Sequence, residues 1–556
     1  MISLTAEQKS IEGMFCQTTE QYIIPQYQRP YSWGNEQCYQ LYQDLMDAFV
    51  DNEPYFVGNV ILARNKNFDL SGESSVVDGQ QRLITLWTII KVLSMLMPDL
   101  NSLRSALYVE PWEGNDNLPK IKSFIFENDD NSALEYIYSL DKNTTEDRLK
   151  ATSINNDIIE SKCSSAIEYA LLLFYQLFTN DVRFVNKETE LNAFAKYLMK
   201  RVSLLPIVQT AEEEKDAIGK ALTIFETINN RGMDLEDADI FKARLYESAY
   251  KKDQRDDFVA QWVDFKAECN AQRYSVDDIF RFYSHIIRGL QKITSGEKKL
   301  RDFFTNESFS PLLTMPYNKV LGELNKVLTI LKYLKNECRK DKNINTWLQI
   351  INEYSNQYPI YAVVTYLYHY SVETDVEKKD FIDFLQSLVR FCLLTGATTT
   401  VKFGIYNIIK TISFQKRIET YRVDDITSDS FDHLGRLKNS FALLAYHLST
   451  SDPIPDKYTI DKIVNLRDEE SLDSDWKYNN LNDICNSIGN LVVLDIPKKY
   501  NSIRDKAKYY NTSHNKYVKE VITGEVFTYL DWKNRNKQMK EKLLKFFKNA
   551  YSIIFK

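Results

Sequence analysis

The amino-acid sequence predicts an α+β protein that is predominantly helical. Gly (16) and Pro (13) together account for only 29 of the 556 residues, which is few turn-forming residues for so long a chain. Apolar side chains recur at helical spacing through most of the chain, whereas short runs rich in Val, Ile and aromatic residues occur mainly towards its two ends. Long helices with a limited amount of sheet account for both observations.

The elements expected in the first part of the chain alternate between short strands and helices. Strand-like runs occur at 22–24, 55–62 and 75–77, and a run at 204–208 resembles a further strand. Helices are expected over 35–49, where apolar residues recur every fourth position, from Gln80 onwards, and through most of 130–250. The helix containing residues 221–225 is expected to end at Asn229–Gly232, because Asn and Gly tolerate a left-handed backbone.

The rest of the chain divides into a helical part and a mixed part. Residues 255–445 are expected to be almost wholly helical, with apolar stripes at Leu321, Leu324, Leu328 and Leu331 and at Phe381, Phe384, Leu388 and Phe391. After a linker over 449–455, a strand is expected at 490–494 and a basic helix at 532–547. We therefore predict three domains: 1–250, 251–450 and 451–556.

Composition excludes several classes of protein. No apolar run approaches the roughly 18 residues of a membrane span, and the first residues lack the layout of a signal peptide. The seven cysteines are scattered without a CxxC pair, which argues against a disulfide framework or a zinc ribbon. Neither HExxH, GxSxG nor a complete Walker phosphate loop is present. A cytoplasmic protein without a membrane segment is expected.

Charge is unevenly distributed along the chain. From Lys498 to Lys556 there are 15 basic against 5 acidic residues, whereas the other 497 residues contain 55 basic and 72 acidic residues, a net charge of −17. Lys537, Lys540 and Lys545 of the basic helix are candidate contacts to DNA phosphates. The alternative is that this stretch is the solvated face of an amphipathic helix.

The segment Val76-Val77-Asp78-Gly79-Gln80-Gln81-Arg82-Leu83 is the strongest candidate for chemistry. It reads as a strand, a turn and the start of a helix, where free N–H groups and the helix dipole favour a bound anion. Arg82 is suited to clamp a phosphate, and Asp78 to hold Mg²⁺ or orient a water molecule. The alternative is structural: Asp78 caps the helix and Arg82 forms a surface ion pair.

Two further segments carry similar side chains. One is an aromatic, arginine-bearing loop, Ile24-Pro25-Gln26-Tyr27-Gln28-Arg29-Pro30-Tyr31-Ser32-Trp33; the other is a helix end and turn, Phe225-Glu226-Thr227-Ile228-Asn229-Asn230-Arg231-Gly232-Met233-Asp234-Leu235. Together with the Asp-Gly-Gln-Gln-Arg segment, and in this order, they resemble the N-terminal domain family of GmrSD-type, modification-dependent (type IV) restriction systems. The same domain occurs in SspE-type defence proteins.

The resemblance covers about residues 1–250 and implies a ParB/sulfiredoxin-like α/β fold with a helical extension that binds and hydrolyses an NTP. Mg²⁺ is expected as a cofactor from the charge of Asp78, not from the resemblance. Carried over by motif, the catalytic candidates are Asp78, Gln81 and Arg82, and the nucleotide-binding candidates are Gln28, Arg29, Gln80, Asn229 and Arg231. We expect these groups to line one polar cleft.

Members of this family often end in a His-Me finger (HNH-like) nuclease domain, and residues 455–556 resemble its later part through Ile488-Gly489-Asn490-Leu491 and Asn501-Ser502. The earlier part departs, because Lys462 stands where the resemblance requires the histidine that acts as general base. The degenerate site would contain Asp461, Lys462, Asn490 and Asn501, with Asp461 as a metal contact. We expect a small α+β domain with little or no cleavage activity.

The function expected is that of an NTP-hydrolysing or nucleotide-gated component of an anti-phage defence system that senses or acts on DNA. One alternative is a non-catalytic nucleotide-binding sensor or adaptor that recruits a separate effector. A second alternative is an active DNA-nicking endonuclease. The expected partners are DNA, an NTP and an effector protein or a second copy of the chain, with no membrane partner.

Overall fold

The fold was analysed in a computed structural model. It describes residues 3–17, 19–65, 72–110, 117–125, 129–155, 157–185, 187–229, 237–250, 252–396, 400–415, 426–432, 434–466, 472, 474–477, 480–495, 503–513, 515–521 and 527–548. The chain divides into two compact units, one formed by residues 1–266 and 304–321 and the other by residues 267–303 and 322–556.

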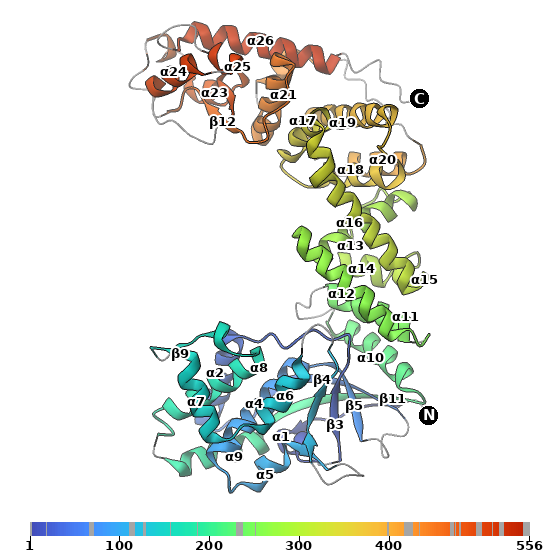
Figure 1. Cartoon of the computed structure of the whole chain (residues 1–556), viewed down its shortest axis with the longest axis vertical. Coiled ribbons are helices and arrows are strands. Elements are labelled where there is room, and N and C mark those ends of the chain that lie inside the picture. The colour runs from blue at the N-terminus through green and yellow to red at the C-terminus, as the bar shows by residue number, and fades with distance from the viewer. Residues whose placement is uncertain are drawn as a thin grey trace. The chain divides into compact units, whose positions relative to one another are not determined.

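The first unit is built around a sheet that has seven strands in the described part of the chain (Figure 1). Its order is β1 (Ser3–Ala6), β11 (Val202–Ala211), β4 (Tyr55–Asn65), β5 (Glu73–Asp78), β3 (Gln21–Ile24) and β8 (Ile121–Ser123), with β2 (Lys9–Ser10) also paired to β11. Strands β3, β5 and β8 are mutually parallel, and β4 runs antiparallel to β5. The carboxyl ends of three neighbouring strands therefore meet at one edge.

Helices cover this sheet and bury its core (Figure 1). The most deeply buried is α4 (Gln80–Leu96), which follows β5 directly and contacts α8 (Ala166–Asn180). The other helices of this region are α1 (Ile11–Phe15), α2 (Asn35–Val50), α5 (Asn101–Ser105), α6 (Asp130–Ser139), α7 (Lys142–Thr152) and α9 (Glu188–Arg201). Because α4 is apolar on nearly every face, it is fixed at the centre of the unit.

Later helices return to the sheet. Helix α10 (Glu214–Asn229) contacts β4, β5 and β11, and α11 (Asp237–Tyr250) contacts the loop that follows β3. Beyond them lie α12 (Arg255–Gln272), α14 (Leu300–Thr305) and α15 (Pro311–Thr314).

The first part of the second unit is helical. They are α13 (Val276–Leu290), α16 (Tyr317–Lys340), α17 (Lys342–Asn352), α18 (Tyr358–His369), α19 (Asp375–Gly396), α20 (Lys402–Ile412) and α21 (Lys438–Thr450). The leucine stripe of α16 is buried as predicted, and so is the α19 stripe apart from the half-buried Phe391.

The same unit ends in a small mixed region. Strands β12 (Thr459–Lys462) and β13 (Leu491–Leu494) pair antiparallel. Around them lie α22 (Ser474–Lys477), α23 (Leu481–Asn486), α24 (Ile503–Thr512), α25 (Lys516–Lys519) and α26 (Tyr529–Lys548). Helix α26 is tied to the start of β13, because Trp532 Nε1 donates to Ser487 Oγ (2.8 Å) and Arg535 Nε donates to Gly489 O (3.1 Å).

The predicted class, α+β and predominantly helical, is confirmed, and so are the predicted strands within β3, β4, β5, β11 and β13. Strands β1, β2, β8 and β12 were not predicted, because each has at most four residues and no clear alternation. The predicted linker is bonded to α17, where Ile454 N donates to Thr346 Oγ1 (3.2 Å). The three-domain division stays a prediction. Among the described helices, none is long and apolar enough to cross a membrane.

Candidate functional site

The turn between β5 and α4 is shaped by Gly79. Its φ of +90° is one that side-chain-bearing residues rarely adopt. A Cβ at this position would lie 3.0 Å from both Asn59 O and Val60 Cγ2 of the neighbouring strand β4. Conformation and space therefore both require glycine between the strand and the helix.

The N-terminus of α4 is left open at the edge of the sheet. Gly79 is the N-cap residue, and no side chain among the described residues caps the helix. The first N–H groups of a helix have no partner within it, and in a helix of 17 residues they form a positive end that favours an anion. Asp78 accepts a hydrogen bond from the adjacent Gly79 N–H and is not the helix cap.

Asp78 lies within electrostatic range of two guanidinium groups. Burial raises the pKa of this carboxyl group above its ordinary value of 3.8, while the positive charges of Arg82 and Arg29 and the Gly79 N–H act in the opposite direction. Both arginines are therefore close enough to Asp78 to act on its charge. One anionic and two cationic side chains thus share the edge of the sheet where α4 begins.

Arg82 is held by the sheet as well. Its Nη1 donates to Asn59 O at 2.7 Å, and its guanidinium lies 3.4 Å from where a Cβ on Gly58 would be. Because a guanidinium carries five N–H donors, this single bond leaves most of them for another partner. Arg82 is therefore oriented by β4 rather than by a simple surface ion pair.

Three glutamine side chains fix the loop after β3 onto this turn. Gln28 Nε2 donates to Val77 O (2.8 Å) and to Val76 O (3.2 Å). Gln80 Nε2 donates to Arg29 O (2.5 Å). Gln81 Nε2 donates to Pro30 O (3.1 Å), and its Oε1 accepts from Ser32 N (2.9 Å). These amides position Arg29, while the catalytic role of Gln81 stays a prediction.

One polar atom remains open beside this network. Gln80 is only 4% exposed, and its Oε1 has no hydrogen-bond partner among the described residues. A buried acceptor without a partner is costly unless a ligand or water supplies the donor. It marks a place where a donor group of a ligand would be stabilised.

The third sequence segment is flanked by elements that reach the same edge. Helix α10 contacts β4 and β5, and from α11 Lys242 Nζ lies 3.3 Å from Gln28 O. The ring of Tyr246 packs on Tyr27 at 5.0 Å between centroids. The side chain of Asn229 and the whole of Arg231 lie outside the described residues, so their place in the site stays a prediction.

Sequence reasoning missed three residues that support the loop after β3: Asp130, Thr85 and Lys242. Asp130 is 2% exposed, and its Oδ2 accepts from Tyr31 N at 2.8 Å. Tyr31 in turn shares a hydrogen bond with Thr85 of α4 (2.8 Å between oxygens). Lys242 is also buried. Only Asp130 had a signal, its place at a helix start; Lys242 is recognisable only once α11 is seen to lie against the loop.

The candidate residues of the C-terminal region form a more closed arrangement. Lys506 Nζ lies 3.1 Å from Asp461 Oδ2 and donates to the backbone oxygen of Lys462; the Lys506 side chain is 1% exposed. The half-buried Lys462 has a different side-chain partner, since its Nζ donates to Asn486 Oδ1 (3.0 Å). The two lysines near Asp461 therefore differ: Lys506 is buried against the carboxylate, and Lys462 is bonded elsewhere.

Asn490 has a structural role in the same region. It is fully buried; its Oδ1 accepts from Val464 N (2.9 Å) and its Nδ2 donates to Val464 O (2.8 Å). These bonds hold the chain that leaves β12. Asn501 lies outside the described residues, and the nuclease assignment of this region stays a prediction.

The three candidate DNA-binding lysines differ in their surroundings. Lys537 and Lys545 are exposed on α26. Lys540 is an exception: it is 8% exposed and ion-paired with Asp432. Its charge is neutralised inside the unit, which leaves two of the three for an external phosphate.

The structure also bears on metal binding. Within the described parts of the chain, no group of three or more His, Cys, Asp or Glu side chains is placed to hold a metal ion. Asp461 is paired with a buried ammonium group, which repels a cation. Asp78 fits Mg²⁺ only together with phosphate oxygens, because one carboxylate beside two arginines is not enough by itself.

Comparisons with known proteins agree with the geometry of the first unit. Residues 11–246 match the family described as GmrSD restriction endonuclease, N-terminal domain. No curated protein sequence matches the chain. The matched range contains the residues described around Asp78, from Tyr27 to Tyr246, and not those of the C-terminal region. Residues 11–246 are therefore similar to the N-terminal domain of GmrSD-type restriction endonucleases.

Proposed function

We propose that the edge of the sheet around Asp78 binds and hydrolyses a nucleoside triphosphate, and that the protein is a component of a modification-dependent, restriction-like defence system that senses or acts on DNA. The observation that carries the proposal is that Asp78, Arg82 and the backbone of Arg29 gather at the uncapped N-terminus of α4, with both arginines in electrostatic range of Asp78. Similarity to a restriction family supports the biological setting.

The chemistry follows from the charges. Free N–H groups at a helix end and two guanidinium groups are the donors that bind phosphate oxygens, and they also stabilise the charge that develops when a phosphoanhydride bond breaks. Asp78 is the acidic group at the same place, suited to orient the attacking water. If Mg²⁺ accompanies the nucleotide, Asp78 and the phosphates would hold it, and it would neutralise phosphate charge.

Phosphate release by the purified chain tests this proposal directly. Each NTP would be incubated with wild type, Asp78→Asn and Arg82→Ala, with Asp147→Asn as the matched control, since the Asp147 side chain is 79% exposed and far along the sequence. We expect turnover in wild type and control, and at least a hundredfold loss in the two site variants. Equal release by all four proteins would exclude the site.

The same experiment separates hydrolysis from pure sensing. A sensor or adaptor would bind the nucleotide, as measured by equilibrium dialysis, without releasing phosphate. Binding that is lost in Arg82→Ala, with no turnover in wild type, would favour the adaptor function.

For the C-terminal region we propose a role in binding DNA or a partner rather than in cleavage. Lys462 stands at the position expected for the general base, and an ordinary lysine is protonated at neutral pH, so it cannot accept a proton. The test is incubation of the chain with supercoiled DNA, NTP and Mg²⁺ or Mn²⁺. Nicking that disappears in Lys462→Ala would overturn this assignment.

A further inference from the structure

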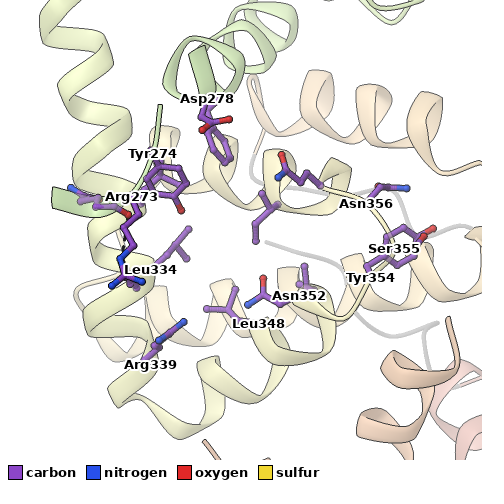
Figure 2. A pocket seen from close by; sticks show the side chains of 17 residues that line it. Arg273, Tyr274, Asp278, Leu334, Arg339, Leu348, Asn352, Tyr354, Ser355 and Asn356 are labelled. Atoms are coloured by element: carbon purple, nitrogen blue, oxygen red, sulfur yellow. Dashed lines mark hydrogen bonds between the residues drawn. The ribbon is translucent and has the colours of Figure 1, made fainter. Parts of the chain in front are cut away.

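The second unit contains a pocket of about 700 Å³ that the function proposed above does not use. It is formed by the turn after α12, by α13, α16 and α17, and by the loop from α17 to α18. Its volume is within the range of about 300–1,000 Å³ that is typical of small-molecule sites. Its lining divides into a cationic end, an apolar middle and an end that carries amides (Figure 2).

One end of the pocket is cationic. Arg273 and Arg339 lie at this end (Figure 2). Lys335 also lines the pocket, and its Nζ is 3.4 Å from the backbone oxygen of Gln272, the residue before Arg273. The positive charge of Arg339 acts on the hydroxyl of Tyr274, opposing the rise in its pKa that burial causes. The one carboxylate in the lining, Asp278, already accepts from Ser275 N (2.9 Å) and Ser275 Oγ (2.7 Å). A ligand bound here would meet net positive charge.

The middle of the pocket is apolar, and its other end carries amides. Leu334 and Leu348 lie between the two ends (Figure 2). The buried Leu331 and Ile351 also line the pocket. At the far end, Asn352 has no hydrogen-bonded side-chain atom among the described residues, and Asn356 uses only its Oδ1, which accepts from Tyr358 N (3.1 Å). Donors and an acceptor are therefore available at this end.

A buried polar atom near the cationic end also lacks a partner. Gln272 is 8% exposed; its Nε2 donates to Glu268 Oε1 (2.7 Å), and its Oε1 has no partner in the described part of the chain. An acceptor in this state needs a donor such as a ligand hydroxyl. Because Gln272 directly precedes Arg273 and its backbone oxygen binds Lys335, a hydroxyl of a sugar whose phosphate sits at the cationic end is a suitable donor.

We propose that this pocket binds a single nucleotide unit. Its phosphate contacts Arg273, Lys335 and Arg339, a sugar hydroxyl donates to Gln272 Oε1, the flat base lies on the leucines, and the polar edge of the base meets Asn352 and Asn356. Inorganic phosphate would leave the apolar middle uncovered, and a fatty acid would leave the amides unpaired. A free mononucleotide and the terminal nucleotide of a single strand share this chemistry.

Direct titration of the full chain tests the proposal. The ligands are the four ribonucleoside 5′-monophosphates, inorganic phosphate, and a short single-stranded oligonucleotide with a 5′-phosphate. Saturable binding of a monophosphate alone assigns a free nucleotide, and binding of the oligonucleotide in competition with it assigns a strand end. No saturable binding of either, or binding no tighter than that of inorganic phosphate, overturns the proposal.

Variants locate the binding. Arg339→Ala is expected to weaken it about tenfold or more, and Asn352→Trp, at an exposed position, is expected to block it by filling the pocket. Lys340→Ala is the matched control, since its side chain is 72% exposed, paired with Glu337 and outside the pocket. Arg82→Ala distinguishes the two sites: loss of binding in that variant, but not in Arg339→Ala, would place the nucleotide in the first unit and refute the pocket.

Discussion

Two strand ends in this molecule carry the same types of residue and use them differently. Asp78 ends β5 and Asp461 is the last residue but one of β12, and each has a cation beside it. Asp78 faces two half-buried arginines and an uncapped helix, whereas Asp461 pairs with a lysine that is almost wholly buried. The first carboxylate remains available to a ligand and the second is consumed by the fold. Environment, not residue type, separates a site from a structural ion pair.

The largest effect is expected from breaking the closed pair. Lys506→Met leaves the Asp461 carboxylate without its buried partner, which should lower the free energy of unfolding of this region by about 3–5 kcal/mol. Urea unfolding followed by circular dichroism, with limited proteolysis of the second unit, measures the loss. The double variant Asp461→Leu and Lys506→Met should recover most of it. A single variant as stable as wild type would mean that the pair is not structural.

A substitution of Gly79, in the turn between β5 and α4, should change both stability and NTP turnover. Gly79→Ala forces a side chain onto a backbone with φ of +90° and into contact with β4, so we expect a loss of about 1–3 kcal/mol in stability together with the loss of NTP turnover. Gly322→Ala is the counterpart in α16, where a Cβ meets nothing within 4 Å, and it should be stabilising by about 0.5–1 kcal/mol. Thermal unfolding should show a lower Tm for Gly79→Ala and a higher Tm for Gly322→Ala than for wild type.

The exposed face of α26 offers a smaller, ionic effect. Reversing Lys537 and Lys545 to glutamate should lower DNA affinity about tenfold at 0.1 M salt and make its salt dependence shallower, because each phosphate contact releases counterions. Lys340→Glu serves as the control, because Lys340 is also exposed and lies outside α26. Unchanged affinity would show that α26 does not contact DNA.

The smallest effect concerns the pH dependence of stability. Because burial raises the pKa of Asp78 above 3.8, the folded chain holds this proton more tightly than the unfolded chain does. The stability linked to it is complete below pH 3.8 and is lost as the pH rises through the raised pKa. Asp78→Asn lacks this loss, so its stability relative to wild type should increase over that range and then level off. A difference that is independent of pH would contradict the raised pKa.

Much of the fold could be predicted from the sequence, because helical stripes and apolar strand runs are local signals. The helix from Gln80 and the strand before Asp78 were predicted within a few residues of their bounds. Strand pairing could not be predicted: β11 lies beside β4 although more than a hundred residues separate them. No pattern in the local sequence specifies such a partner.

The candidate site was predictable as a set of residue types but not as a network. Gln28 is a predicted nucleotide contact and Gln81 a predicted catalytic residue; the structure adds that their amides bind the backbone of neighbouring segments. The burial of Lys506 and Lys540 had no signal either, since lysine is usually exposed and only tertiary contacts bring Asp461 and Asp432 to them. The motifs indicated the family, whereas the hydrogen-bond partner of each side chain could be seen only in the fold.

The order of strands in the sheet has a consequence for how the chain folds as it is synthesised. The strands around Asp78 come from the first 123 residues, so this half of the sheet can pair early. Strand β1 is made first but pairs with β11, where Ser3 lies opposite Thr210. Until β11 leaves the ribosome, β1 has no strand to pair with. Over the same period β4 exposes an unpaired edge to other nascent chains. A chain that stopped before Val202 would therefore be prone to aggregate even with its polar turn already formed.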